Sequence, residues 1–205
     1  MSRKSNTEER RAEIVRALLA AMAEHGYEKA TIQLIAQKAG LAPGLVHYHF
    51  KTKAEILLEL IRTLASLSRQ RYDAFAESAK SADDRLRAYI NARLAKGEGA
   101  DPHAVAAWVV IGAEAVRQPE VRSIYQDVVR SEAELIETLL TACFKERGKA
   151  RAQVKPLAAA LLALIEGAFQ LASAAPDVMP AGYAAGTAIK LFESYIDGVA
   201  ERGQA

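Results

Sequence analysis

Residues 31–57 read TIQLIAQKAGLAPGLVHYHFKTKAEIL, and this stretch decides the expected fold. In its first part, apolar residues recur at the i, i+3 and i+4 spacing of one helix face: Ile32, Ile35 and Ala36. Gly40 falls where that helix would end and the chain would turn sharply. A second short helix follows, with Val46 and Phe50 four residues apart on one face. Two short helices joined by a glycine-containing turn form a helix-turn-helix pattern.

The second helix of such a motif lies in the major groove of DNA, with its first residues against base edges. Here it begins with Ala42, Pro43 and Gly44, which are small enough to allow close approach. The charge distribution agrees, because residues 1–53 hold nine Lys and Arg against five Asp and Glu, a net +4. Residues 54–205 hold eighteen against twenty, a net −2. A basic N-terminal segment suits a partner that carries phosphates, so we expect double-stranded DNA as a partner.

Residues 8–57 as a whole resemble the DNA-binding domain of the TetR family of transcriptional regulators. The parts of the family pattern follow one another in order: an Arg- and Ala-rich helix over 10–24, then Gly26 and Tyr27, Thr31, Ile35 and Ala36, Ala39 and Gly40, Tyr48 to Phe50, and Thr52 to Glu55. A bare helix-turn-helix pattern is weak evidence, whereas this linked series is specific. The resemblance implies a ligand-responsive regulator, most often a repressor, that binds a near-palindromic operator as a dimer.

The remaining chain predicts further helices and no sheet, since it lacks alternating period-2 stretches. The expected fold is all-α, with about nine helices at roughly 8–25, 32–39, 43–49, 52–79, from a junction at 81–84 to 96, 102–118, 119–147, 154–174 and 181–201. Thr52 with Glu55 predicts a capping box, and Asp101 with Pro102 predicts another helix start. We expect a DNA-binding domain over 1–52 and a ligand-binding and dimerisation domain over 53–205.

The body carries a second resemblance, between Trp108 and Tyr125. This segment follows the pattern W...GAEA.R.PEVR.IY, which is similar to the C-terminal domain of the subgroup that includes the betaine-pathway repressors. The subgroup resemblance implies a small-molecule effector that binds in the body.

Several features favour a cytoplasmic protein that does not span a membrane. Cys143 is the single cysteine, so no intrachain disulfide can form, and residues 2–11 lack the apolar core of a signal peptide. The most apolar stretch, Leu157 to Leu171, is interrupted by Glu166 and is expected to be too short for a bilayer.

Candidate DNA contacts divide into those that position the protein on phosphates and those that read bases. The resemblance implies phosphate contacts at Thr31, Tyr48 and Lys53, while residue chemistry adds Lys51 and, at the backbone, His49. The candidates for base edges are Ala42, Pro43, Gly44 and His47. Thr31 could instead serve only as a helix cap, and Tyr48 could pack with its hydroxyl in solvent. Val46 and Phe50 are expected to be core.

The sequence departs from the common family pattern at two positions. Leu45 replaces the usual Thr or Ser, and His47 replaces the usual Tyr. Leu45 removes a hydroxyl but can meet a thymine methyl. The operator sequence of other members therefore cannot be carried over to this protein.

The last two expected helices are apolar on more than one side, which indicates burial on more than one side. A second chain can supply that burial, and the family uses these helices for its dimer interface. We expect dimer contacts from Leu157, Leu161, Ile165, Phe192 and Tyr195. The alternative is a monomeric bundle with these helices at its centre.

The expected effector pocket lies among the middle helices. Its candidate residues are Trp108, Glu114, Tyr125, Glu166 and Phe169. Each has an alternative role: Trp108 as core, and Glu114 in an i,i+3 ion pair with Arg117. The two carboxylates sit in apolar surroundings and must find a partner, because a stranded buried charge is unfavourable.

Two other classes of protein are alternatives to a regulator. A helical small-molecule binding or carrier protein would keep the pocket without using the head on DNA. An enzyme is disfavoured because no Gly-rich phosphate loop or nucleophile motif occurs. No metal or cofactor site is predicted, since His47 and His49 are two apart and point to different sides of a helix.

Overall fold

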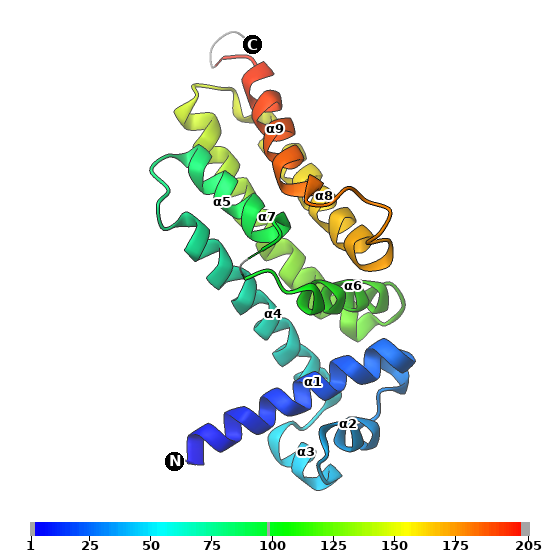
Figure 1. The fold of residues 1–205 in the computed structure, drawn as a ribbon. Coiled ribbons are helices and arrows are strands. Elements are labelled where there is room, and N and C mark those ends of the chain that lie inside the picture. Colours follow the sequence, from blue (N-terminus) through cyan, green and yellow to red (C-terminus); the bar gives the residue numbers. More distant parts are fainter. Residues whose placement is uncertain (1–2, 98, 202–205) are drawn as a thin grey trace. The chain divides into compact units, whose positions relative to one another are not determined.

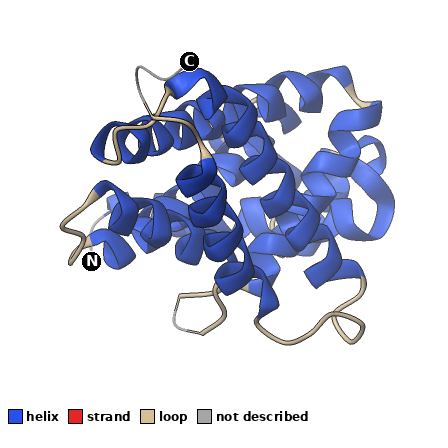
Figure 2. Ribbon diagram, turned by 90° about the horizontal axis from the view of Figure 1, so that it is seen from above, coloured by secondary structure: helices blue, strands red, loops and turns tan. Residues whose placement is uncertain are grey.

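The computed structural model describes residues 3–97 and 99–201 of the 205-residue chain, and the described residues are helical with no strand (Figure 2). The helices are α1 (Arg3–Lys29), α2 (Ile32–Ala39), α3 (Pro43–His49), α4 (Lys53–Ala76), α5 (Ala82–Leu94), α6 (Pro102–Arg117), α7 (Pro119–Glu146), α8 (Val154–Ala174) and α9 (Tyr183–Gly198), with a 3-10 turn at Arg151–Gln153. The all-α prediction is confirmed, and helix ends differ from the expected ones by a few residues.

The largest differences lie at the two ends of α1. The helix begins at Arg3 and extends past Gly26, where the sequence predicted its end. Gly26 itself is not helical, with φ 79° and ψ 162°, so the chain kinks there before a last helical turn to Lys29. Glycine adopts this backbone region freely, which explains why the kink occurs at this residue.

The chain divides into two compact units that do not follow a single cut in the sequence. We call the first the head unit: residues up to Ser66 together with Ala107–Gln126. The second, the body unit, holds Leu67–Ala106 together with the residues from Asp127 onward. Helix α4 starts at Lys53 in the head unit and continues past Ser66 without a break.

In the head unit, α1 packs against α2 and α3, and α2 packs against α3 (Figure 1). All four N-terminal helices contribute to its core, with buried side chains that include Ile14, Leu18, Met22, Ile35, Val46, Ile56 and Leu57, and Phe50 directly after α3. The predicted core positions Val46 and Phe50 are therefore confirmed.

The turn between α2 and α3 is the one that the glycine predicted. Gly40 has φ 67°, and its N–H donates to the carbonyl of Gln37. The next N–H, of Leu41, donates to the carbonyl of Ala36 at 2.9 Å. This pair of bonds is a Schellman motif, which satisfies the last carbonyls of α2 and turns the chain toward Pro43.

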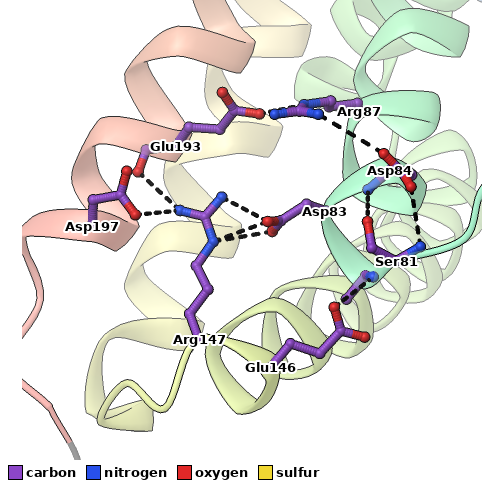
Figure 3. A network of polar contacts seen from close by, with 9 residues as sticks. Ser81, Asp83, Asp84, Arg87, Glu146, Arg147, Glu193 and Asp197 are labelled. Atoms are coloured by element: carbon purple, nitrogen blue, oxygen red, sulfur yellow. Dashed lines mark hydrogen bonds and ion pairs between the residues drawn. The ribbon is translucent and has the colours of Figure 1, made fainter.

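In the body unit, α5, α8 and α9 pack against one another (Figure 1). Figure 3 shows a polar network that joins α5 and α9 to the residue that follows α7. The Arg147 guanidinium donates to Asp83 at 2.8 Å and to Asp197 at 2.6 Å, and Arg87 pairs with Glu193. These pairs join the N-terminal end of α5 to the C-terminal end of α9 and to the residue that follows α7.

One helical segment of the described residues is long and apolar enough to cross a bilayer by length and composition. It runs over Arg151–Ala174, 24 residues, so the expectation that this stretch is too short was wrong about its length. A core helix meets the same criteria. The buried share of its apolar window is 33 %, and Leu157, Leu161 and Ile165 of α8 are among its buried residues.

Candidate nucleic-acid interface and ligand cavity

Most residues of α3 and its flanking positions are exposed to solvent. Pro43 occupies the first turn, where its missing N–H is not needed and its fixed φ favours the helix. Val46 and the following Phe50 are buried, so they hold one face of the helix against the rest of the head unit. The other residues of the segment are exposed: Ala42, Pro43, Gly44, Leu45, His47 and Tyr48. Among them, Tyr48 is 70 % exposed and Leu45 is 38 % exposed.

Thr31 caps α2 as expected. Its hydroxyl oxygen accepts a hydrogen bond from the N–H of Leu34 at 3.2 Å, and the residue is exposed. The capping role is confirmed, while contact with a phosphate stays a prediction.

Arg11 of α1 holds the end of α3, a contact that the sequence did not predict. Its guanidinium donates to the carbonyl of His49 at 2.9 Å and to the Glu59 carboxylate of α4 at 2.9 Å. The guanidinium carbon also lies 4.1 Å from the centroid of the Phe50 ring, a cation–π distance. One side chain thus joins α1, α3 and α4 and sets the position of the exposed helix.

His49 is half-buried at the end of α3, and its ring meets Tyr48 edge to face at 5.1 Å between centroids. Burial lowers the pKa of its imidazole below the usual value, and the positive charges of Arg11 and Arg10 lower it further. A lowered pKa keeps this ring neutral at neutral pH. His49 can therefore form hydrogen bonds through a neutral ring rather than carry a full charge.

The start of α4 carries a variant of the predicted capping box. The Thr52 hydroxyl accepts from the N–H of Glu55 at 3.1 Å, as predicted. The Glu55 carboxylate accepts from the N–H of Lys51 at 2.7 Å rather than from that of Thr52. The exposed Lys51 ammonium donates to the carbonyl of His47 at 3.2 Å, so it lies beside α3.

Lys53 is turned inward. Its ammonium donates to the carbonyl of Tyr27 at 2.6 Å and lies 4.0 Å from the centroid of that tyrosine ring. Burial lowers the pKa of the Lys53 ammonium, against the opposing effect of Glu120, Glu28 and Glu114. The Tyr27 hydroxyl in turn donates to Glu120 at 2.9 Å, at the start of α7. Sequence reasoning did not find this chain of contacts.

Three of the predicted pocket residues belong to the head unit. The rings of Trp108 and Tyr125 stack at 4.9 Å between centroids, and Trp108 is buried. Glu114 is buried at 4 % exposure and accepts from Arg117 at 2.7 Å, which is the expected i,i+3 pair. This pairing supplies the partner that its buried carboxylate needs.

The body unit contains a cavity of about 470 Å³. It lies among the C-terminal ends of α5 and α8, the start of α6 and the segment that leads into α9. Its apolar and aromatic wall includes Leu94, Val105, Phe169, Met179, Pro180 and Tyr183. Of the five predicted pocket residues, Phe169 lines this cavity, and Trp108, Glu114, Tyr125 and Glu166 do not.

Comparison with known proteins adds the decisive observation. Residues 14–60 match the family described as bacterial regulatory proteins, tetR family, and residues 82–201 match that described as BetI-type transcriptional repressor, C-terminal. The second match spans more than half of the chain. The protein belongs to the TetR family, in its BetI-type subgroup.

The relatives of this TetR-family chain include BetI transcriptional regulators. It is 33 % identical over 115 residues to BetI of Rhizobium meliloti, a match over 56 % of each chain. It is 26 % identical over 190 residues to BetI of Brucella suis biovar 1, which covers 91 % of this chain and 89 % of the relative. The matches to the Rhizobium and Agrobacterium relatives span little more than half of those proteins' lengths, 56 % and 55 %.

Solved structures show the same TetR fold at lower identity. A protein from Pseudomonas aeruginosa PAO1 matches with a TM-score of 0.77 and 22 % identity, over 93 % of this chain and 90 % of that one. A protein from Saccharomonospora viridis, solved in complex with choline, matches with a TM-score of 0.68 and 24 % identity, over 95 % and 100 %.

In this TetR-family chain, most of the predicted dimer residues are already buried inside one protomer. Leu157, Leu161, Ile165 and Phe192 are between 0 % and 7 % exposed, because α5, α8 and α9 pack on one another. Tyr195 differs, since its side chain is 44 % exposed. Other exposed apolar side chains on these helices are Leu171 and Leu191.

Proposed function

We propose that this protein is a cytoplasmic transcriptional repressor that binds a near-palindromic operator as a homodimer and is released by a small-molecule effector. The observation that carries the proposal is the surface of α3. This helix is anchored by Val46 and Phe50 and presents small residues and Tyr48 to solvent. A rigid helix with a slim, exposed N-terminal end is suited to close approach to base edges. Membership of the TetR family supports the same role.

We assign the base contacts to the start of α3, where Ala42, Pro43, Gly44 and His47 are exposed. Leu45, 38 % exposed, is available for a thymine methyl. Phosphate contacts are assigned to the residues that flank this helix and carry hydroxyl, ring or ammonium donors: Thr31, Tyr48, His49, Lys51 and Lys53. Of the two lysines, Lys51 has the exposed ammonium, so it is the stronger electrostatic contact.

The dimer interface proposed here uses the outward faces of α8 and α9. Leu171, Leu191 and Tyr195 are exposed there, and the exposed α8 residues Ala159, Ala163 and Gly167 are small enough for close helix approach. A two-fold dimer presents two head domains to half-sites one helical turn apart or a multiple of it. We place the boundary between DNA-binding and dimerisation domains near residue 52, at the start of α4.

The effector is proposed to bind in the body, and the 470 Å³ cavity is large enough for a small organic molecule. An effector can release DNA only if it binds the conformation that does not fit the operator more tightly than the one that does. The choline complex of the Saccharomonospora viridis protein supports a small effector for this fold. A carrier protein that does not use its head on DNA is the second candidate, since a cavity alone would serve it.

The test is selection of bound duplex from fragments of the source genome by the full-length protein, followed by affinity measurements on the selected site. Replacement of Lys51 by Met should weaken binding to every duplex, whereas Arg85→Met, the same charge change on the body unit, should not. Failure to enrich any duplex would refute the repressor and leave the carrier.

A further inference from the structure

The cavity of the body unit carries an excess of positive charge. Among its described lining residues are Arg71 of α4, Arg93 of α5 and Lys96, against one carboxylate, that of Asp101. The described lining residues therefore carry a net charge of +2. Aliphatic and aromatic side chains form most of the remaining wall.

The carboxylate among the described lining residues, that of Asp101, is already engaged. Asp101 Oδ1 accepts hydrogen bonds from the N–H groups of His103 at 2.9 Å and Ala104 at 3.2 Å, at the start of α6. The positive end of the helix dipole compensates the charge of this side chain. Asp101 is thus poorly placed to neutralise the arginines or to attract a cation.

The two arginines have unmet hydrogen-bonding capacity. Arg71 donates to the carbonyls of Ala92 at 2.7 Å and Ala95 at 2.6 Å, and Arg93 donates to the Ser68 hydroxyl at 2.6 Å. All three acceptors are uncharged. The Nε atom of each guanidinium is buried without a hydrogen-bond partner. Burial also lowers the pKa of Arg71, the effect expected of a cation held away from water.

A cationic ligand would meet unfavourable surroundings in this cavity. Quaternary ammonium groups are recognised by the faces of aromatic rings. The aromatic lining residues are Phe169 and Tyr183, and the guanidinium carbon of Arg93 already lies 5.1 Å from the Phe169 centroid. A second cation at that ring would be repelled by the first.

We infer that the effector of this cavity is an organic anion, a carboxylate or similar group on an apolar body, and not a quaternary ammonium. The anionic head would lie near Arg93 and Arg71, where a charged acceptor gives the strongest hydrogen bonds. The apolar part would lie against the aliphatic wall. This inference rests on the proposed function only in calling the ligand an effector.

The test compares three probes with the same eight-carbon tail on the full-length protein by isothermal titration calorimetry without DNA. Octanoate should bind about tenfold or more tightly than octyltrimethylammonium and octanol, the difference expected from one charge-assisted hydrogen bond. Choline should give no measurable binding. Equal affinities, preference for the ammonium, or no binding of octanoate would each overturn the inference.

Variants locate the binding site. Arg93→Met should weaken octanoate binding about tenfold, and Lys96→Met, at an exposed position, should weaken it several-fold. Arg85→Met is the matched control, because Arg85 is exposed on the same helix but does not line the cavity. Octanoate affinity that survives both cavity substitutions would overturn the assignment.

The outcome is separable from that of the repressor proposal. If the protein binds octanoate through Arg93 but enriches no genomic duplex, the anion site is supported and the repressor proposal is refuted. If it binds an operator but prefers octyltrimethylammonium to octanoate, the repressor proposal is supported and the anion site is refuted.

Discussion

The ammonium of Lys53 lies 2.6 Å from the carbonyl oxygen of Tyr27 and 4.0 Å from the centroid of the same residue's ring. Lys53 begins α4, and Tyr27 follows the kink of α1 at Gly26. The carbonyls at the end of a helix carry partial negative charge, so a lysine there is favourable. This contact joins two helices of the head unit. It gives Lys53 a structural role besides the phosphate contact that the family resemblance implies.

Replacement of Lys53 by Met should lower the free energy of unfolding by about 1–2 kcal/mol, since it removes a charge-assisted hydrogen bond and a cation–π contact. Lys51→Met, at an exposed position, should change it by less than about 0.5 kcal/mol. Urea denaturation measures both. The salt dependence of operator binding should fall by about one unit of slope for Lys51→Met. Unchanged stability in Lys53→Met would show that the inward contact contributes nothing.

Gly26 should tolerate no side chain. Its φ of 79° and ψ of 162° lie in a region that only glycine adopts readily, which costs another residue about 1–3 kcal/mol. A Cβ added there would also lie 3.2 Å from Oε1 of the buried Glu114. Gly26→Ala is therefore expected to destabilise the protein more than Gly40→Ala. Gly40 has φ 67° and ψ 30° and open space around it, so only the left-handed backbone opposes alanine, by about 1–2 kcal/mol.

Thermal and urea unfolding of the two alanine variants measure this difference. The double variant Gly26→Ala/Glu114→Ala should recover the part of the lost stability that comes from crowding between the added Cβ and the Glu114 carboxylate. Equal destabilisation at the two glycines would contradict the geometry found at Gly26.

Arg11 should affect both stability and DNA binding, although it is not itself a predicted DNA contact. Arg11→Met removes the hydrogen bonds to His49 and Glu59 and the contact with the Phe50 ring, so we expect a loss of about 1–3 kcal/mol. Operator affinity should fall as well, because the end of α3 loses its support. The control is Arg10→Met, which breaks only an i,i+3 pair with Glu13, a contact of about 0.2–0.5 kcal/mol. Equal effects of the two substitutions would refute a positioning role for Arg11.

The titration of His49 provides a pH-dependent readout of the same contact. Its pKa is lowered in the folded state, so the unfolded chain binds the proton first as the pH falls below about 6.5. Stability should therefore decline as the pH falls through this window, until the folded imidazole is also protonated. Arg11→Met removes one repelling charge and should raise the pKa of His49, measured by NMR of the ring protons. A lower or unchanged pKa in the variant would contradict the assigned cause.

Local patterns were sufficient for the helices and for the anchors of α3. The four-residue spacing of Val46 and Phe50 predicted two buried side chains, and Gly40 predicted the turn, because both follow from the geometry of one helix and its cap. Contacts between residues far apart in the sequence could not be read in this way. Arg11 meets His49 across 38 positions and Lys53 meets Tyr27 across 26, and only the packed fold brings them together.

The cavity was also beyond local reasoning. Its basic residues Arg71 and Arg93 lie on α4 and α5, which carry both apolar and charged residues. In the sequence of such a helix, a charged residue normally indicates a face exposed to solvent. Phe169 was found because it is a large apolar residue on α8. Helices α8 and α9 present a further difficulty. A helix that is apolar on all sides is expected to be buried, but its sequence pattern does not indicate which face is buried within the protomer. Leu161 and Ile165 are buried inside one chain, whereas Ala159, Ala163 and Leu171 of the same helix are exposed.

The start of α5 should give the body unit a stability that is lost in acid. The Ser81 hydroxyl accepts from the N–H of Asp84 at 3.0 Å, and the Asp84 carboxylate accepts from the N–H of Ser81 at 3.1 Å (Figure 3). The same carboxylate accepts from the N–H of Lys80, also at 3.1 Å. The hydrogen bond to Ser81 and those from the two backbone groups lower the pKa of Asp84. A lowered carboxyl pKa stabilises the fold fully above the unfolded value of about 3.9, and this contribution is lost as the pH falls through the folded value.

Asp84→Asn should therefore have a lower melting temperature than the native protein at neutral pH. The difference between the two melting temperatures should become smaller as the pH falls toward 3. Ser81→Ala should lower stability by about 1 kcal/mol through loss of the helix cap, and it should raise the pKa of Asp84 because the largest cause of the shift is removed. NMR titration of the Asp84 carboxyl carbon in the native protein and in Ser81→Ala measures this directly. If Asp84 has the same pKa in the native protein and in Ser81→Ala, then Ser81 does not cause the lowered pKa. The pH dependence must then arise from other groups at this end of α5.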